Sequence, residues 1–325
     1  AKDLGIKSNG IKLIVLALAW LLADLTYRII EVPFRKKFKP KTLLNILVVT
    51  SFCLFFIGLG MSKWPKSRLS QNDMANKVTT ATADYVFPKN QYVINYTNES
   101  KRNASVLFIG DSHAQAYYHA IEILAQRDPT ISAAFSTRSG CPVLPNVNRM
   151  IPGYDCPIDY KRNMASAYLP QFKKIIITDF WHGYVEGVYL LEPDPIDGLS
   201  TDKLTIDGIK RASFHELEKK YIELAQELKK LKSMGKEIIL ISSNPDNNFA
   251  NPALLLSNVR IPFSKKSDFV SSFPLAGFKK HVAWTDGQLK KVSEISGAKL
   301  IDPSIYTCPN GICITIENDQ TPIYK

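Results

Sequence analysis

The sequence has little cysteine and little histidine, with five of each among 325 residues. No pair of histidines lies at metal-ligand spacing near the cysteines, so we expect no metal site. Acidic residues are scarce only in residues 1–68, which hold 12 Lys and Arg against 3 Asp and Glu, whereas the rest holds 29 basic and 27 acidic residues. Because nucleic-acid binding needs a concentrated positive face, this nearly neutral part argues against nucleic acid as a partner.

Two N-terminal segments are almost free of charge. Residues 43–61 contain no charged side chain and, as a helix, would span about 28 Å, close to the hydrocarbon thickness of a bilayer. Residues 13–30 contain only Asp24 and Arg28 as charges, so we predict a second span that packs against protein. The alternatives are a buried globular helix for either segment and a signal peptide for residues 13–30. The chain opens with Ala, and we expect a fragment of a larger protein.

Basic residues predict how the two spans are oriented. The connection between them carries a cluster of five, Arg35, Lys36, Lys37, Lys39 and Lys41. By the positive-inside rule this connection is cytoplasmic, and everything after residue 62 lies across the membrane. We therefore expect the protein in a bacterial inner membrane, in contact with membrane lipid, with its large domain in the periplasm. Four cysteines fit an oxidising compartment, because Cys141 with Cys156 and Cys308 with Cys313 form two close pairs that we predict to be disulfides.

The pattern of the chain changes at residue 105. Residues 64–103 are polar with little periodicity, which is typical of a linker. Beyond them, continuous apolar strands, including 105–110, 131–136 and 173–181, alternate with amphipathic helices. This order predicts a three-layer α/β/α sandwich with a mainly parallel sheet.

The sequence Gly110-Asp111-Ser112-His113 stands between the first of these strands and a helix. In open α/β sheets, ligands bind beyond the carboxyl ends of strands, where free N–H groups of a helix start hold anionic oxygens. Ser112 is therefore a candidate nucleophile whose oxyanion is met by its own backbone N–H. The alternative is that Asp111 or Ser112 is only a helix N-cap.

This block resembles the first sequence block of the SGNH hydrolase/acyltransferase superfamily. The resemblance implies that Ser112 forms an acyl-enzyme and that Gly140, in STRSGCPVL, donates a second oxyanion N–H. The usual Gly-X-Asn-Asp block is absent, and TDFWHGY stands in its place. Candidates for the wall of the site are Asp111, His113, Asp179, Trp181 and His182.

The general base of this superfamily comes from an Asp-X-X-His block near the C-terminus, and the chain contains no such block. We expect that the fragment stops shortly before it and is therefore almost inert. The alternative is that His182 or another histidine of the chain is the base.

The N-terminal part carries a second resemblance. Tyr27, Glu31, Pro33 and Phe34, in LTYRIIEVPFRKK, resemble the end of the membrane domain of acyltransferase family 3. The whole chain thus resembles the C-terminal half of a fused acyltransferase-3/SGNH protein. The implied domains are the last core helix in 1–36, a cytoplasmic loop and additional span in 37–62, a periplasmic linker in 63–103, and an SGNH domain in 104–325.

The resemblance implies an O-acetyltransferase of a cell-surface polysaccharide, such as the O-antigen of lipopolysaccharide. The rest of the membrane domain would take acetyl groups from acetyl-CoA, and Ser112 would deliver them to a sugar hydroxyl, with no cofactor bound in the SGNH domain. Tyr117, Trp181 and Tyr184 are candidates for a sugar groove, although each is equally explained as a core residue. The alternatives are a carbohydrate acetylesterase and a non-catalytic glycan-binding module.

Overall fold

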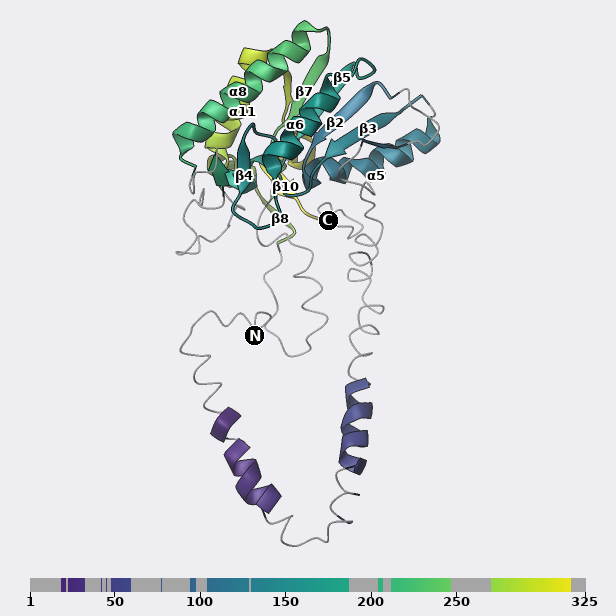
Figure 1. The fold of residues 1–325 in the computed structure, drawn as a ribbon, viewed down its shortest axis with the longest axis vertical. Coiled ribbons are helices and arrows are strands. Elements are labelled where there is room, and N and C mark those ends of the chain that lie inside the picture. Colours follow the sequence, from purple (N-terminus) through teal and green to yellow (C-terminus); the bar gives the residue numbers. More distant parts are fainter. Residues whose placement is uncertain are drawn as a thin grey trace. The chain divides into compact units, whose positions relative to one another are not determined.

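The computed structural model describes residues 19–21, 23–32, 42, 45, 48–59, 77, 94–97, 104–128, 130–186, 204–206, 212–246 and 270–316. The chain divides into two compact units, Ala1–Arg68 and Leu69–Lys325 (Figure 1).

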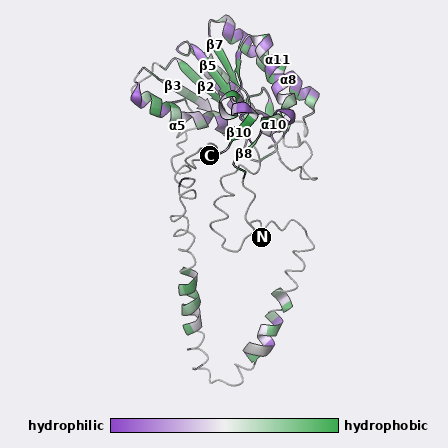
Figure 2. Cartoon of the chain, turned by 180° about the vertical axis from the view of Figure 1, so that it is seen from behind, coloured by the Kyte–Doolittle hydropathy of each residue, from purple (hydrophilic) through white to green (hydrophobic). Residues whose placement is uncertain are grey.

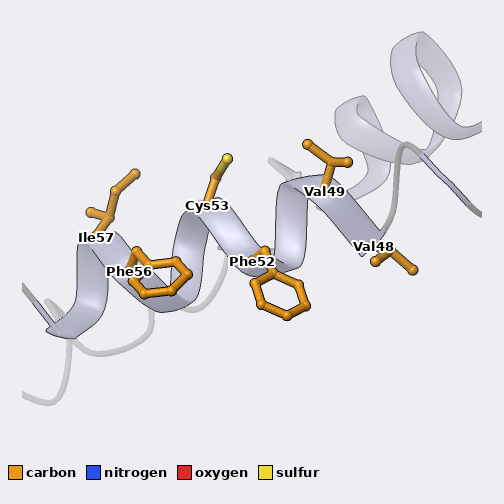
Figure 3. A pocket seen from close by; sticks show the side chains of 6 residues that line it. All are labelled: Val48, Val49, Phe52, Cys53, Phe56 and Ile57. Atoms are coloured by element: carbon orange, nitrogen blue, oxygen red, sulfur yellow. The ribbon is translucent and has the colours of Figure 1, made fainter.

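The described part of the first unit is helical. It includes a π-helical segment, η2 (Tyr27–Glu31), and a helix at residues 48–59. Figure 3 shows the side chains along the second helix, which are Val48, Val49, Phe52, Cys53, Phe56 and Ile57. Within the described residues, no helix combines the length and the apolar character needed to cross a bilayer. Both predicted spans extend into residues outside the described ones and stay predictions.

The second unit is built on a six-stranded sheet with the order β1-β3-β2-β5-β7-β9. Five neighbouring strands run parallel: β2 (Val106–Gly110), β3 (Ala133–Thr137), β5 (Lys174–Thr178), β7 (Glu237–Ile241) and β9 (Lys299–Ile301). The edge strand β1 (Asn95–Tyr96) pairs antiparallel with β3. Gly110 lies opposite both Thr137 and Thr178, so the three central strands end level at one edge.

Helices cover both faces of this sheet, because the strands are apolar on both sides. Alternate residues of β2 enter different cores, since side chains of a strand point to opposite faces in turn. Leu107 and Ile109 join the cluster formed with α6 (Cys156–Ala167), α8 (Phe214–Ser233) and α11 (Ala283–Ser296), whereas Phe108 packs with residues of α5 (Ser112–Arg127). Figure 2 shows the hydrophobic strands between helices with more hydrophilic outer surfaces. The predicted three-layer sandwich with a mainly parallel sheet is confirmed.

Local signals explain where the long helix α8 begins and ends. Ser213 and Glu216 form a capping box at its start, in which each side chain accepts from the other residue's backbone N–H. Gly235 follows its end with a φ of 82°, a conformation that glycine adopts without steric cost.

Smaller elements complete the unit. Strand β4 (Val147–Arg149) pairs with β6 (Leu204–Ile206), and β8 (Ser272–Pro274) pairs with β10 (Ile312–Ile314). The short helices are α7 (Trp181–Val185), α10 (Leu275–His281), α12 (Ser304–Thr307) and η4 (Pro309–Gly311). The strand predicted over 173–181 ends earlier, at Thr178, because Trp181 begins α7. Both predicted disulfides, Cys141–Cys156 and Cys308–Cys313, are present.

A substitution of Gly110 tests whether the strand ends must approach as closely as they do in the structure. A Cβ atom at this position would overlap the carbonyl oxygen of Thr178 and lie 2.6 Å from the Cβ of Ala114. We expect Gly110→Ala to lower the free energy of unfolding by about 2 kcal/mol or more in urea denaturation, because backbone atoms must move.

Gly287→Ala is the matched control, since a Cβ atom there meets nothing within 4 Å. Within helix α11 the same substitution should stabilise by about 0.5–1 kcal/mol. Equal effects of the two substitutions would contradict the steric role of Gly110.

Candidate active site

Three loops meet at the carboxyl edge of the sheet. The N–H of Arg138, after β3, donates to the carbonyl oxygen of Gly110 at 3.0 Å. The N–H of Phe180, after β5, donates to Oδ2 of Asp111 at 3.3 Å, and the N–H of Val143 donates to Oδ2 of Asp179 at 2.6 Å. The loops after β2, β3 and β5 are thus joined in pairs around the point where α5 begins.

Ser112 is the first residue of α5 and is half-buried. The N-cap of the helix is Asp111, whose Oδ1 accepts from the N–H of His113 at 2.7 Å. The capping alternative therefore holds for Asp111, and it does not account for a serine at the next position. Ser112 as nucleophile stays a prediction, and its place in the first turn of a helix suits a developing oxyanion.

Asp111 and Asp179 form a pair of buried carboxyl groups, exposed by 1% and 2%. A hydrogen bond joins them. Oδ2 of Asp111 also accepts from the hydroxyl of Tyr184 at 2.6 Å. Together with the bond to Val143, this network connects all three loops through two carboxyl groups.

The two carboxyl groups differ in protonation. Burial raises the pKa of Asp179 well above its usual value, and the negative charge of Asp111 raises it further. Burial also acts to raise the pKa of Asp111, but hydrogen bonding and charge from His113 and the hydroxyl of Tyr184 outweigh it, so this pKa is lowered. The two opposite shifts favour an ionised Asp111 beside a protonated Asp179. Burial and the nearby carboxylates raise the pKa of Tyr184, so its hydroxyl remains a donor.

Gly140 is held in a turn after β3 with a φ of 75°. Its carbonyl oxygen accepts from Nη1 of Arg149 at 3.3 Å, and a Cβ atom at this position would lie 2.8 Å from the hydroxyl oxygen of Tyr154. The left-handed conformation and the close neighbours both require glycine here. The disulfide from the next residue, Cys141, ties the turn to α6. The role of the Gly140 N–H in an oxyanion hole stays a prediction.

The other predicted wall residues lie in different surroundings. The imidazole of His113 stacks on the ring of Phe180 at 4.5 Å between centroids. Trp181 is fully buried in the main core, and its Nε1 donates to the carbonyl oxygen of Ile241 at 2.9 Å. The structure packs its large apolar ring between sheet and helices, and Trp181 as a wall residue stays a prediction. Tyr117 and Tyr184 are partly buried and pack against the cores, as the alternative for these aromatics expected.

His182 is buried and pairs with Asp246, with 3.1 Å between Nε2 and Oδ1. The ring of Phe180, which stacks on the imidazole of His113, also packs edge-on against the imidazole of His182, with 4.9 Å between the ring centroids. Sequence reasoning named His182 but missed its carboxylate. A signal was present, since Asn244, Pro245 and Asp246 follow β7 within a few residues, at the same edge as Ser112.

Sequence reasoning also missed Arg149 and the hydroxyl role of Tyr184. Neither had a local signal, because both act on residues from other loops. Within the described ranges, no group of three or more His, Cys, Asp and Glu side chains is arranged to hold a metal ion.

The fold and this edge define a class of protein: α/β sandwiches with a serine that opens the helix after the first central strand, next to a glycine turn. Residues 79–325 match the family model described as "SGNH domain (fused to AT3 domains)". The chain belongs to this family, and the membership indicates an acyltransferase-related role.

Other comparisons add little. The periplasmic domain of the lipopolysaccharide acetyltransferase of Salmonella ser. Paratyphi A is similar in structure, with a TM-score of 0.43 and 14% sequence identity. That similarity covers 77% of this chain and 87% of the Salmonella chain. Among curated proteins, none matches the chain.

Asp179→Asn tests the protonated state of this carboxyl group. Folding raises the pKa of Asp179, so the folded wild type holds a proton on this carboxyl group at pH values above its ordinary pKa of 3.8. The stability of the wild type is therefore lost as the pH rises through the folded-state pKa. Asparagine is neutral at every pH and still donates to Asp111. We expect the variant to gain stability relative to the wild type as the pH rises, measured by urea denaturation at several pH values.

Asp179→Ala is the contrasting variant, because it removes the acceptor of the Val143 N–H and one of the partners of the Asp111 carboxyl group. It should lose about 1–3 kcal/mol at all of these pH values. Parallel pH profiles for the wild type and Asp179→Asn would contradict the protonated state.

Proposed function

We propose that this protein is an O-acetyltransferase that moves an acetyl group, through an ester on Ser112, to a sugar hydroxyl of a cell-surface polysaccharide. The observation that carries the proposal is the position of Ser112: it opens a helix at the edge where three loops are joined by the Asp111–Asp179 pair. Family membership supports acyl transfer as the reaction class. The sequence resemblance to acyltransferase family 3 supports acetyl as the group transferred.

The proposed reaction has two halves. Oγ of Ser112 attacks the carbonyl carbon of the acetyl donor, its proton passes to a histidine, and the donor's leaving group departs with a proton. A sugar hydroxyl then attacks the serine ester and gives up its proton to the same histidine. The bond between the acyl carbon and Oγ of Ser112 breaks, the histidine returns the proton to Oγ, and the sugar leaves with the acetyl group. The histidine is that of the expected Asp-X-X-His block, or His182 with Asp246 as the alternative.

The surroundings of Ser112 suit the tetrahedral intermediates of both halves. Ser112 opens helix α5, and the positive end of a helix dipole favours a developing negative charge. The proposed second donor, the N–H of Gly140, belongs to a turn held by Arg149 and the disulfide. Donors fixed before the reaction stabilise an oxyanion without the cost of reorganising them.

The proposed donor for the whole protein is acetyl-CoA, used on the cytoplasmic side by the membrane domain. The proposed acceptor is a polysaccharide such as O-antigen, and the proposed location is the inner membrane with the second unit in the periplasm. Fusion to AT3 domains, which the family description names, supports this arrangement.

Ser112→Ala tests the proposal in a bacterial host that expresses the full-length protein, with its membrane domain and the expected Asp-X-X-His block, and makes unacetylated O-antigen. We expect the wild type to add acetyl groups, seen by proton NMR of the purified polysaccharide, and Ser112→Ala to reduce them by about a thousandfold or more. Mass spectrometry of the wild type should find an acetyl ester on the peptide that contains Ser112.

Ser233→Ala is the matched control, since Ser233 is exposed at the end of α8, and it should acetylate as the wild type does. Two results would overturn the proposal. Loss of acetyl groups from an already acetylated polysaccharide, dependent on Ser112, would indicate an esterase. Unchanged polysaccharide with equal glycan binding by wild type and Ser112→Ala would indicate a binding module.

A further inference from the structure

We propose that Arg149 binds an anionic group, a carboxylate or a phosphate, of the acceptor that occupies the Ser112 site. This inference deepens the proposed function, because it names a chemical feature of the acceptor for the same site. It starts from a half-buried guanidinium group beside Gly140 that pairs with no carboxylate of the described residues.

Three contacts fix the guanidinium group of Arg149. Its Nη1 donates to the carbonyl oxygen of Gly140 at 3.3 Å. Its Cζ lies 5.1 Å from the ring centroid of Tyr154 and 5.9 Å from that of Tyr184. The hydroxyl of Tyr184 donates to Asp111, the residue before Ser112. The side chain of Tyr184 therefore connects Arg149 with the turn that carries the candidate nucleophile, Ser112.

Two other arginines near the same turn show how this protein neutralises a guanidinium group. Nε of Arg138 lies 3.2 Å from Oδ2 of Asp159, and Nη1 of Arg162 lies 2.8 Å from Oδ1 of the same carboxylate. A charge withdrawn from water is costly unless it is paired. Asp159 offsets that cost for Arg138 and Arg162, whereas among the described residues Arg149 has only a carbonyl oxygen and two aromatic rings.

The contacts of Arg149 leave donors for a ligand. A guanidinium group has five N–H donors in one plane, and its contacts within the described part of the chain use one of them, at Gly140. The tyrosine rings attract its charge and do not use its N–H edge. Such a fork matches the paired oxygens of a carboxylate or a phosphate.

If Arg149 had a structural role alone, its bond to Gly140 would be explained, but its remaining N–H donors beside the site would have no role. A uronic acid and a sugar phosphate both offer the anionic oxygens that these donors fit. The two sources share one recognition chemistry, and separate probes distinguish them.

Binding measurements test the inference directly. The purified protein is titrated calorimetrically with a galacturonic acid trisaccharide, with inorganic phosphate and with a neutral galactose trisaccharide. We expect the wild type to bind at least one anionic probe about tenfold or more tightly than the neutral sugar, and added salt to reduce this preference. Arg149→Gln should abolish the preference.

Arg127→Gln is the matched control, because it makes the same change in charge at an exposed position at the far end of α5. It should keep the preference of the wild type. Arg149→Lys provides a second test that retains the charge: it should bind anionic probes more weakly than the wild type, because lysine lacks the planar fork. Near-ultraviolet circular dichroism checks that each variant is folded.

Equal binding of anionic and neutral probes by the wild type would overturn the inference. So would an unchanged preference in folded Arg149→Gln. The titration uses no acyl donor, so a failure of acetyl transfer would overturn the proposed function and leave the binding result standing.

Discussion

Two carboxyl groups that cannot both ionise hold the edge of this sheet together. Asp111 and Asp179 are buried side by side, and a single negative charge between them is stabilised by hydrogen bonds from Tyr184 and from backbone N–H groups. The N–H of His113 belongs to the same segment as Asp111, whereas the N–H of Phe180 and the hydroxyl of Tyr184 come from the segment after β5. The N–H of Val143, after β3, donates to Asp179. The electrostatic cost of burying charge is therefore offset only when the loops after β2, β3 and β5 are all in place.

This arrangement explains why a small hydroxyl residue follows an acid and precedes a helix. Asp111 takes over both the capping of α5 and the contact to the loop after β5. Ser112 is thus placed at the helix start by its neighbour. Gly110 allows the strands to end close together, and Gly140 brings the neighbouring turn to the same edge.

The parts of this structure that could be predicted from the sequence carry local signals. Continuous apolar strands between amphipathic helices indicate a parallel sheet, and the spacing of Cys141 and Cys156 indicates a disulfide. Contacts between loops have no such signal: the bond from Tyr184 to Asp111 and that from Arg149 to Gly140 join segments that only the fold brings together. Trp181 shows the opposite case, since its position after a strand suggested the site, while its size and apolar character place it in the core.

The Cys141–Cys156 disulfide makes the turn around Gly140 depend on oxidation of two cysteines as well as on folding. Cys141 directly follows Gly140, and Cys156 is the first residue of α6. The turn and the helix are therefore parts of one covalent ring that closes by removal of two electrons and two protons from a pair of thiols. In reducing surroundings the chain has every residue of this turn and helix but lacks the disulfide that joins them. The covalent ring therefore forms only where the chain meets an oxidant.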